Sequence, residues 1–187
     1  MKPVHLIGSA PYAPEWWEQH KDQVEIAHCI NNAKAIVGDH QGTWYFSTDF
    51  LIHNNYCFKA LQDRSGQDWH FCTMVSDCLM QPRGYECEYG GTMVLNACYD
   101  ILNRAILKGE CLELNLVGCD MDYSGPQTHF YEGGTADPTR IPQEVLVRHL
   151  NRLNKAYTGF HIIKTLGPPS ILPFVSGNPD MQWKPAS

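Results

Sequence analysis

Short apolar segments with the composition of strands recur along the chain. Each is rich in β-branched, aromatic or aliphatic residues. They lie at residues 4–7, 24–30, 43–48, 69–75, 112–117 and 160–164. The segment 112–117 alternates apolar and polar residues most regularly, which predicts a strand that ends at Gly118.

Between these segments, apolar residues recur at helical spacing. The clearest sets are Val94, Cys98, Ile101, Leu102 and Ala105, and then Leu146, Leu150, Leu153 and Tyr157. Each set places apolar side chains on one face of a helix. We therefore predict helices over 92–108, with Thr92 as its cap and Gly109 after its end, and over 141–157. A shorter helix is predicted from Pro14 to about His20, because proline is favoured in a first helical turn.

Strand and helix alternate with short connections, which favours an α/β fold with a mainly parallel sheet flanked by helices. A length of 187 residues fits one domain. We predict a single Rossmann-like domain over 1–176 and a loosely ordered tail over 177–187. In such sheets ligands bind beyond the carboxyl ends of the strands, near the switch in strand order.

Composition narrows the classes of function. The formal net charge of -6 gives no strong signal for nucleic-acid binding. The chain has no run of about 18 apolar residues, so we predict no transmembrane helix. The first residues resemble a strand rather than a signal peptide. The eight cysteines include no CxxC pair. Because Cys98, Cys111 and Cys119 lie in apolar runs, we expect buried free thiols and a cytoplasmic location.

Two strand ends carry residues suited to a nucleotide. In Gly8-Ser9-Ala10, the glycine lets a phosphate approach the backbone at a helix start. A plain tight turn is the alternative. Asn31 and Asn32 can pair with a base or ribose edge. Turn or cap chemistry is the alternative for these two residues.

Two further motifs allow more than one interpretation. Gly90-Gly91-Thr92 opens the predicted long helix and could form a second backbone cradle, or simply an N-cap preceded by glycines. Asp120 and Asp122 follow a predicted strand and could bind a divalent metal or a sugar hydroxyl, or cap the loop.

His129 lies in a polar loop after the segment 112–117. An imidazole with its usual pKa of about 6.5 suits general base chemistry on a hydroxyl. Tyr123 and Tyr131 flank it and could donate to a phosphate. An ordinary surface histidine with packed tyrosines is the alternative.

The order of these pieces resembles a known family. The matching stretches are Gly91-Thr92-Met93, Leu107-Lys108-Gly109, Leu114-Asn115-Leu116-Val117-Gly118-Cys119-Asp120, His129-Phe130-Tyr131 and Leu166-Gly167-Pro168-Pro169-Ser170-Ile171-Leu172. The chain resembles the bacterial lipooligosaccharide sialyltransferases and their relatives, the motility-accessory glycosyltransferases and the 6-hydroxymethylpterin diphosphokinase-like proteins. The family's first-loop asparagine is Ser9 here. The loop between Asp120 and His129 is short, so we expect a much-reduced lid.

The resemblance implies roles for particular residues. His129 would deprotonate the acceptor hydroxyl, and Tyr123 and Tyr131 would donate to the leaving phosphate. The donor would be a nucleotide sugar such as a CMP-sialic-acid-like compound, and the acceptor a glycan or small molecule. Donor contacts would come from Gly8, Ser9, Ala10, Asn31, Asn32, Gly90, Gly91, Thr92, Gly118, Asp120 and Ser170.

Two other functions stay open at this point. One is a Mg-dependent diphosphokinase that acts on a small hydroxymethyl heterocycle, with magnesium at Asp120 and Asp122. The other is a catalytically silent nucleotide-binding protein, an alternative raised by the short lid. Sugar transfer by His129 requires no cofactor. A homo-oligomer is compatible with the sequence, which leaves the oligomeric state open.

Overall fold

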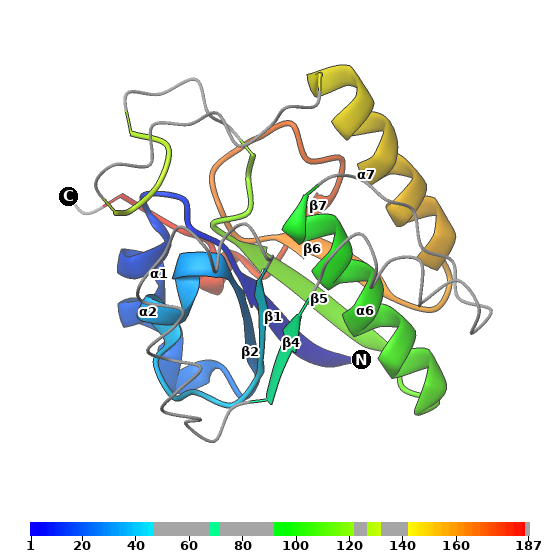
Figure 1. Ribbon diagram of the computed structural model, residues 1–187, viewed down its shortest axis with the longest axis horizontal. Helices are drawn as coiled ribbons and strands as arrows, with labels where there is room; N and C mark the ends of the chain where they lie inside the picture. The colour runs from blue at the N-terminus through cyan, green and yellow to red at the C-terminus, as the bar shows by residue number, and fades with distance from the viewer. Residues whose placement is uncertain (47–67, 72–91, 122–126, 132–141, 186–187) are drawn as a thin grey trace.

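A parallel sheet forms the centre of the fold. The computed structural model describes residues 1–46, 68–71, 92–121, 127–131 and 142–185 (Figure 1). Within these ranges the sheet has seven strands, and every neighbouring pair is parallel. The strands are β1 (Lys2–Ile7), β2 (Ala27–Ile30), β3 (Thr43–Phe46), β4 (Asp68–Phe71), β5 (Leu112–Val117), β6 (Ile162–Thr165) and β7 (Val175–Ser176).

The strand order β4-β3-β2-β1-β5-β6-β7 contains one switch point. The chain builds outward from β1 to β4 on one side, then returns to place β5 against β1 and builds outward to β7. The Rossmann-like α/β prediction is confirmed. The chain continues from β1 toward one side of the sheet and from β5 toward the other. Such folds bind ligands beyond the carboxyl ends of the two strands at which this happens.

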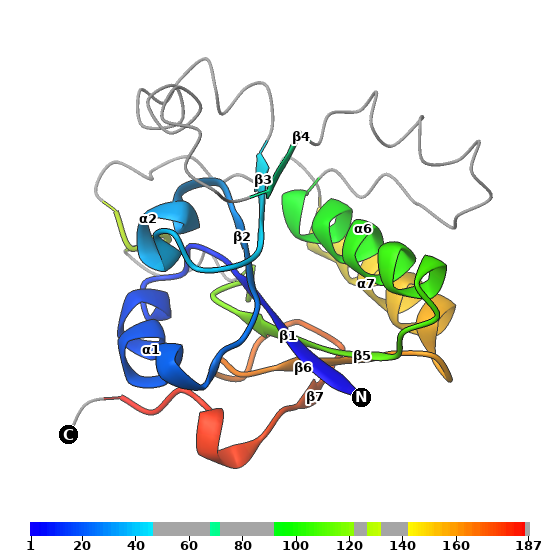
Figure 2. The same ribbon diagram turned by 90° about the horizontal axis from the view of Figure 1, so that it is seen from below.

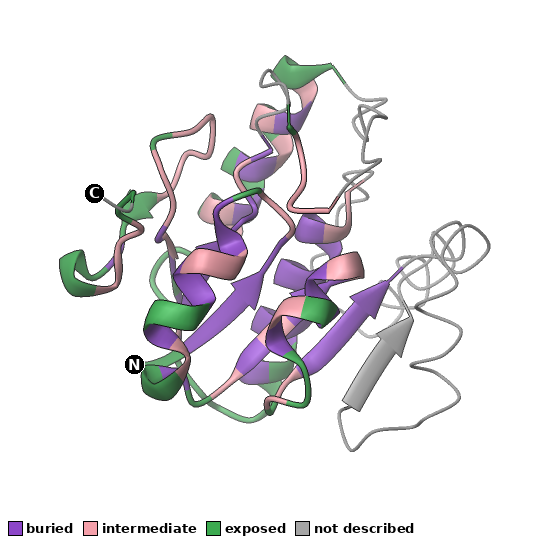
Figure 3. Ribbon diagram, turned by 90° about the vertical axis from the view of Figure 1, so that its left-hand side faces the viewer, coloured by how far each residue is buried: buried purple, intermediate pink, exposed green. Residues whose placement is uncertain are grey.

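Helices cover both faces of the sheet. The helices α1 (Ala13–His20) and α2 (Lys34–Val37) lie on one face, and α6 (Met93–Leu107) and α7 (Gln143–Tyr157) lie on the other (Figure 2). Two apolar clusters follow from this arrangement, one under each helix layer. The central strands are buried while the outer helix faces are exposed (Figure 3).

Local signals in the sequence located α6 and α7 well. The Oγ1 atom of Thr92 accepts from the Leu95 amide at 3.3 Å, as expected for an N-cap. Gly109 follows the helix end with a φ of 69°. The apolar residues predicted for one face of α7 are all buried; they are Leu146, Leu150, Leu153 and Tyr157.

Several boundaries differ from the prediction. β2 begins at Ala27 rather than Val24, and β6 begins at Ile162, leaving Phe160 61% exposed. β6 is not the last strand, because β7 follows it. The short elements η2 (Asn31–Ala33) and α2 were missed. They contain too few residues to show a periodic pattern.

The polar positions of β5 do not face water. Helices and residues 177–185 cover both faces, so Asn115 is only 3% exposed. Glu113 is partly buried, with its Oε2 atom 2.7 Å from Nζ of Lys164. The strand is thus covered on both faces, as expected for a mainly parallel sheet flanked by helices. A central parallel strand is enclosed on both faces whatever its polar residues. Cys111, expected to be buried, is exposed at the start of this strand.

Residues 177–185 pack against the sheet end. The segment was expected to be a loose tail; it contains the short helix η4 (Pro179–Met181). The Trp183 amide donates to the Leu166 carbonyl at 2.8 Å, and the Trp16 indole donates to the Met181 carbonyl at 2.5 Å. The segment runs alongside α1 (Figure 2). None of the helices in the described ranges is long and apolar enough to cross a membrane.

Acid should destabilise the fold through His5, which is buried, and His28, which is partly buried. Burial lowers the pKa of His5 and of His28 to about 4. Below pH 6.5 the unfolded chain binds a proton at each ring, while the folded chain binds none until about pH 4. Stability is therefore complete near neutrality and is lost as the pH falls between these values. We expect a loss of about 2–3 kcal/mol per histidine at pH 4.5, measured by urea unfolding.

A variant that removes one of these rings provides the control. His5→Phe cannot titrate at this position, so the loss of stability between pH 7 and pH 4.5 should fall by about half. An undiminished loss in His5→Phe would show that His5 is not one of the groups responsible.

Candidate functional site

The loops after β1 and β5 pack directly against each other at the switch point. The Gly8 amide donates to the Val117 carbonyl at 2.7 Å, and the Ala10 amide donates to the Gly118 carbonyl at 3.1 Å. A Cβ atom on Gly8 would lie 2.2 Å from the Gly118 oxygen. Gly8 is therefore required for this close approach, in addition to any role toward a ligand.

Two residues other than glycine adopt left-handed backbone conformations beside these loops. Asn31, after β2, has a φ of 48°, and the buried Met121, after β5, has a φ of 57°. Such conformations cost about 1–2 kcal/mol for a residue with a Cβ atom, and they concentrate at functional sites. The strain thus lies at the carboxyl edge of the sheet.

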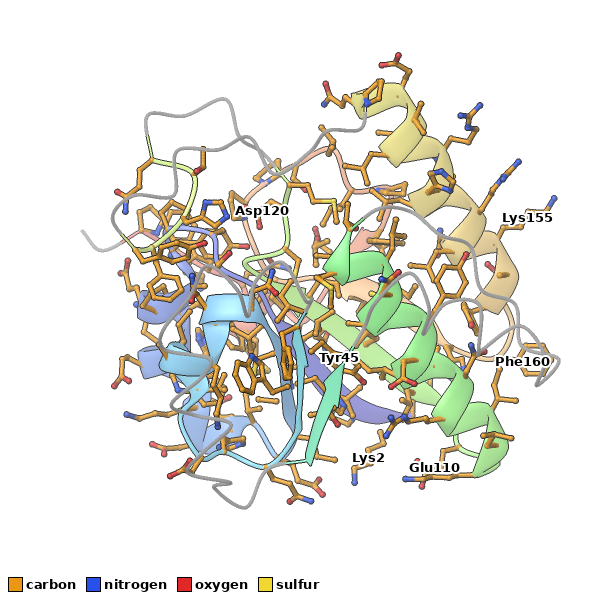
Figure 4. The ribbon with its side chains drawn as sticks, in the orientation of Figure 1. Lys2, Tyr45, Glu110, Asp120, Lys155 and Phe160 are labelled. Carbon is orange, nitrogen blue, oxygen red and sulfur yellow. The ribbon has the colours of Figure 1, made fainter. Side chains whose placement is uncertain are left out.

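Tyr12 connects the first loop to the end of β5. Its hydroxyl donates to Oδ1 of Asp120 at 2.5 Å and accepts from the Gly118 amide at 2.8 Å. Burial and then the neighbouring negative charge of Asp120 raise the pKa of Tyr12, so the hydroxyl stays protonated and can donate. This bond holds the Asp120 carboxylate in one orientation at the strand end. Asp120 lies at the opposite end of the sheet from Lys2 and Glu110 (Figure 4).

The sequence analysis did not identify Tyr12. The pair is separated by 108 residues, and only the packing of β1 against β5 brings them together. Gly167, after β6, completes the enclosure, because a Cβ atom there would lie 1.9 Å from the Tyr12 hydroxyl oxygen.

Removing the Tyr12 hydroxyl should weaken both the fold and the site. Tyr12→Phe leaves the buried Gly118 amide without its acceptor and removes one hydrogen bond from Asp120, so we expect a cost of about 1–3 kcal/mol in urea unfolding. On the sequence-based prediction of a nucleotide site, weaker nucleotide binding should accompany it.

Tyr157→Phe is the matched control for this variant. It removes a buried hydroxyl that donates to Asn103 at 2.7 Å. This bond joins α7 to α6, on the face of the sheet opposite α1. It should cost about 1 kcal/mol and leave nucleotide binding unchanged. Equal nucleotide binding by both variants would argue against a role for Tyr12 at the site.

The segment 127–131 is attached to the edge of the sheet at two points. The Phe130 amide donates to the Ser9 carbonyl at 2.9 Å. The Tyr131 side chain shares a hydrogen bond with Asn32, which partly offsets the rise that burial causes in the pKa of Tyr131. The β1 loop, the end of β2 and this segment are therefore neighbours, and Figures 1 and 2 both place it beside the ends of α1 and α2.

His129 is partly buried within this segment. Its Nδ1 atom lies 2.8 Å from the Thr128 hydroxyl, and its carbonyl accepts from the Gln127 amide group at 2.9 Å. The imidazole packs against the Tyr131 ring, with ring centroids 5.0 Å apart. These contacts orient the ring beside the β1 loop.

Asn31 has an unusual hydrogen-bond pattern. Its carbonyl accepts from the Trp44 indole at 2.9 Å, but its side-chain Oδ1 is buried with no partner among the described residues. An unsatisfied buried acceptor costs about 1–3 kcal/mol. A donor on a ligand would remove this cost.

The structure brings together some of the predicted site residues. Those at or beside the switch point are Gly8, Ser9, Ala10, Asn31, Asn32, Gly118, Asp120, His129 and Tyr131. Thr92 uses its hydroxyl as the cap of α6, and Ser170 accepts from the Leu172 amide at 3.3 Å. Gly90, Gly91, Asp122 and Tyr123 lie outside the described residues.

The predicted metal site stays a prediction. Among the described residues no group of three or more His, Cys, Asp or Glu side chains could hold a metal ion. Asp122 is outside these residues, so the Asp120–Asp122 pair is not tested.

A groove of about 500 Å³ lies beside the site, between residues 165–172 and the C-terminal segment. Gly167 and Trp183 line it, and both contact Tyr12: the Trp183 and Tyr12 ring centroids are 5.2 Å apart. We call it the C-terminal groove. It shares a wall with the Tyr12–Asp120 pair.

Comparisons of the chain with protein-family models, with curated proteins and with solved structures find no match.

Proposed function

We propose that the protein is a glycosyltransferase that uses a nucleotide-sugar donor, with His129 as the base that deprotonates an acceptor hydroxyl. The observation that carries the proposal is the hydrogen bond from the Phe130 amide to the Ser9 carbonyl at 2.9 Å. It joins the segment that contains His129 to the loop best suited to a phosphate. A base and a donor site are then adjacent, as transfer requires.

On the donor side, the proposal assigns the phosphate to the loop Gly8-Ser9-Ala10. The start of α1, next to this loop, provides positive potential for the phosphate. The unpaired Oδ1 of Asn31 would accept from an amino or hydroxyl group of the nucleotide. The hydroxyl of Tyr131, whose pKa burial raises further above neutral, would donate to the leaving phosphate.

On the acceptor side, His129 would take the hydroxyl proton as the oxygen attacks the anomeric carbon. The bond between that carbon and the phosphate oxygen breaks, and the nucleotide leaves with the bonding electron pair. Hydrogen-bond donors placed around the departing phosphate stabilise the charge that develops there. Thr128 keeps the imidazole oriented at Nδ1.

A thermal-shift screen of CMP, UMP, AMP and their sugar conjugates tests the donor site. A nucleotide at one hundred times its Kd should add about 2.7 kcal/mol of stability and raise the Tm. If none of these compounds shifts the Tm, the proposal fails.

Metal dependence distinguishes this reaction from diphosphate transfer. The proposed mechanism predicts that turnover of the nucleotide sugar survives an excess of EDTA, because a base and hydrogen-bond donors perform each step. Complete loss of turnover with EDTA, restored by magnesium, would instead favour a diphosphokinase with magnesium at Asp120 and Asp122.

A further inference from the structure

The C-terminal groove has a lining chemistry that differs from that of the proposed donor site. All its lining residues are uncharged, and all belong to the described segment between Thr165 and Trp183. Flat apolar surfaces come from Pro168, Pro169 and Trp183, while Ser170 and Gln182 add polar groups. The groove therefore offers nothing to neutralise a phosphate, whereas apolar surfaces with a few polar groups suit a neutral hydroxylated ring.

The groove is continuous with the candidate site. Gly167 forms part of its wall, and a Cβ atom at this residue would lie 3.3 Å from Oδ1 of Asp120 and closer still to the Tyr12 hydroxyl. The Trp183 ring packs on the Tyr12 ring at 5.2 Å. A molecule in the groove would thus end beside the switch point, next to the residues assigned to the donor.

Trp183 is held in place but carries an unused donor. Its backbone amide donates to Leu166 at 2.8 Å, which fixes the residue against the end of β6. Its indole N–H is buried and has no hydrogen-bond partner within the described part of the chain. Buried indole N–H groups usually have a partner, so a ligand oxygen at this wall would satisfy a group that is otherwise unpaired.

We propose that the C-terminal groove is the acceptor subsite and that it binds a neutral pyranose ring of the acceptor. This inference rests on the proposed function, because it names the acceptor class of the same site. The ring stacks on the flat wall formed by Trp183 and the two prolines, and its hydroxyls pair with Ser170, Gln182 or the indole. The acceptor hydroxyl then points toward the switch point, beside which the segment with His129 is attached through Phe130 and Ser9. The family resemblance assigns Ser170 to the nucleotide-sugar donor, whereas in this proposal Ser170 contacts the acceptor sugar.

Saturation-transfer NMR tests the groove without requiring catalysis. The probes are methyl β-galactoside, methyl β-glucoside and methyl α-mannoside, each mixed with the full chain. We expect saturation transfer to at least one glycoside, reduced about five-fold or more in Trp183→Ala. Trp183→Phe keeps an aromatic surface without the N–H and should give an intermediate value, and it serves as the variant if Trp183→Ala does not fold.

Phe160→Ala is the matched control. Phe160 is an aromatic residue that is 61% exposed, at the end of the sheet opposite Asp120 (Figure 4). This variant should give the same transfer as the unmodified protein. The Tm shift produced by CMP or UMP should also be unchanged in Trp183→Ala, because the groove does not hold the nucleotide.

The outcomes separate this inference from the proposed function. Nucleotide binding without transfer to any of the three glycosides overturns the acceptor subsite and leaves the donor site standing. Equal transfer in Trp183→Ala and the unmodified protein also overturns it. Glycoside binding that depends on Trp183, in a protein that no nucleotide stabilises, supports the sugar site and rejects the glycosyltransferase proposal.

Discussion

Replacement of His129 by alanine is expected to lower turnover of the nucleotide-sugar substrate by about 10²–10⁴-fold, the usual contribution of a general base. The imidazole is the proposed acceptor of the hydroxyl proton. Its segment is attached to the β1 loop through Phe130 and Ser9, at 2.9 Å, and to the end of β2 through Tyr131 and Asn32. Since these attachments use the backbone and other side chains, the alanine variant should keep its fold. Steady-state release of the nucleotide measures the effect.

Binding measurements separate a loss of chemistry from a loss of the site. The Tm shift caused by the nucleotide should be nearly the same in His129→Ala and in the unmodified protein, because His129 is placed on the acceptor side. His149→Ala is the control, since His149 is a partly buried histidine on α7, on the other side of the sheet from α1. Its turnover should not change. Retained turnover in His129→Ala would remove the histidine from the mechanism.

Replacement of Gly118 by alanine should be among the most destabilising single changes near the site. Gly118 has a φ of 65°, and a Cβ atom there would lie 2.7 Å from the Cβ of Ala13 and 2.9 Å from the Gly8 oxygen. The left-handed conformation costs about 1–2 kcal/mol, and forced overpacking adds about 1–3 kcal/mol. The loops after β1 and β5 would have to separate. Nucleotide affinity should therefore fall together with stability.

Gly109→Ala isolates the packing part of this cost. Gly109 has a φ of 69°, almost the same as Gly118, but no atom lies within 4 Å of the position of its Cβ. This variant should lose only the conformational part, about 1–2 kcal/mol, and bind nucleotide normally. Urea unfolding with an unchanged m-value gives both costs. Equal costs for the two variants would mean that the strand ends tolerate separation.

The sequence by itself determined the elements whose signals are local. In α6 and α7, apolar residues recur at 3.6-residue spacing over four turns, and Thr92 and Gly109 mark the ends of α6, so both helices are recognisable without their surroundings. The bounds of β5 were also predictable, because Gly118 ends an apolar run. The α/β class follows from the alternation of such strands with helices, and with it the edge of the sheet at which such folds bind ligands.

Local sequence patterns could not predict the short helix α2, the outer strand β7 or the start of β2. α2 has four residues and β7 has two, so neither is long enough to show a period. Likewise the early start predicted for β2 followed from the apolar residues Val24 and Ile26, but a strand exists only where a neighbour offers hydrogen bonds. The partner strands pair with this segment from Ala27 onward.

Tertiary structure alone decided the contacts that define the candidate site. Gly8, Asn31, Asp120 and His129 were recognisable because their residue types suit a chemistry. Tyr12 and Trp183 were not, because a tyrosine after a proline and a tryptophan near the C-terminus carry no local signal. Tyr12 meets Asp120 across 108 residues of chain, and Trp183 meets Tyr12 only because the last segment returns along α1. The physical reason is that strand order, which places distant segments side by side, depends on packing of the whole sheet rather than on any local stretch of residues.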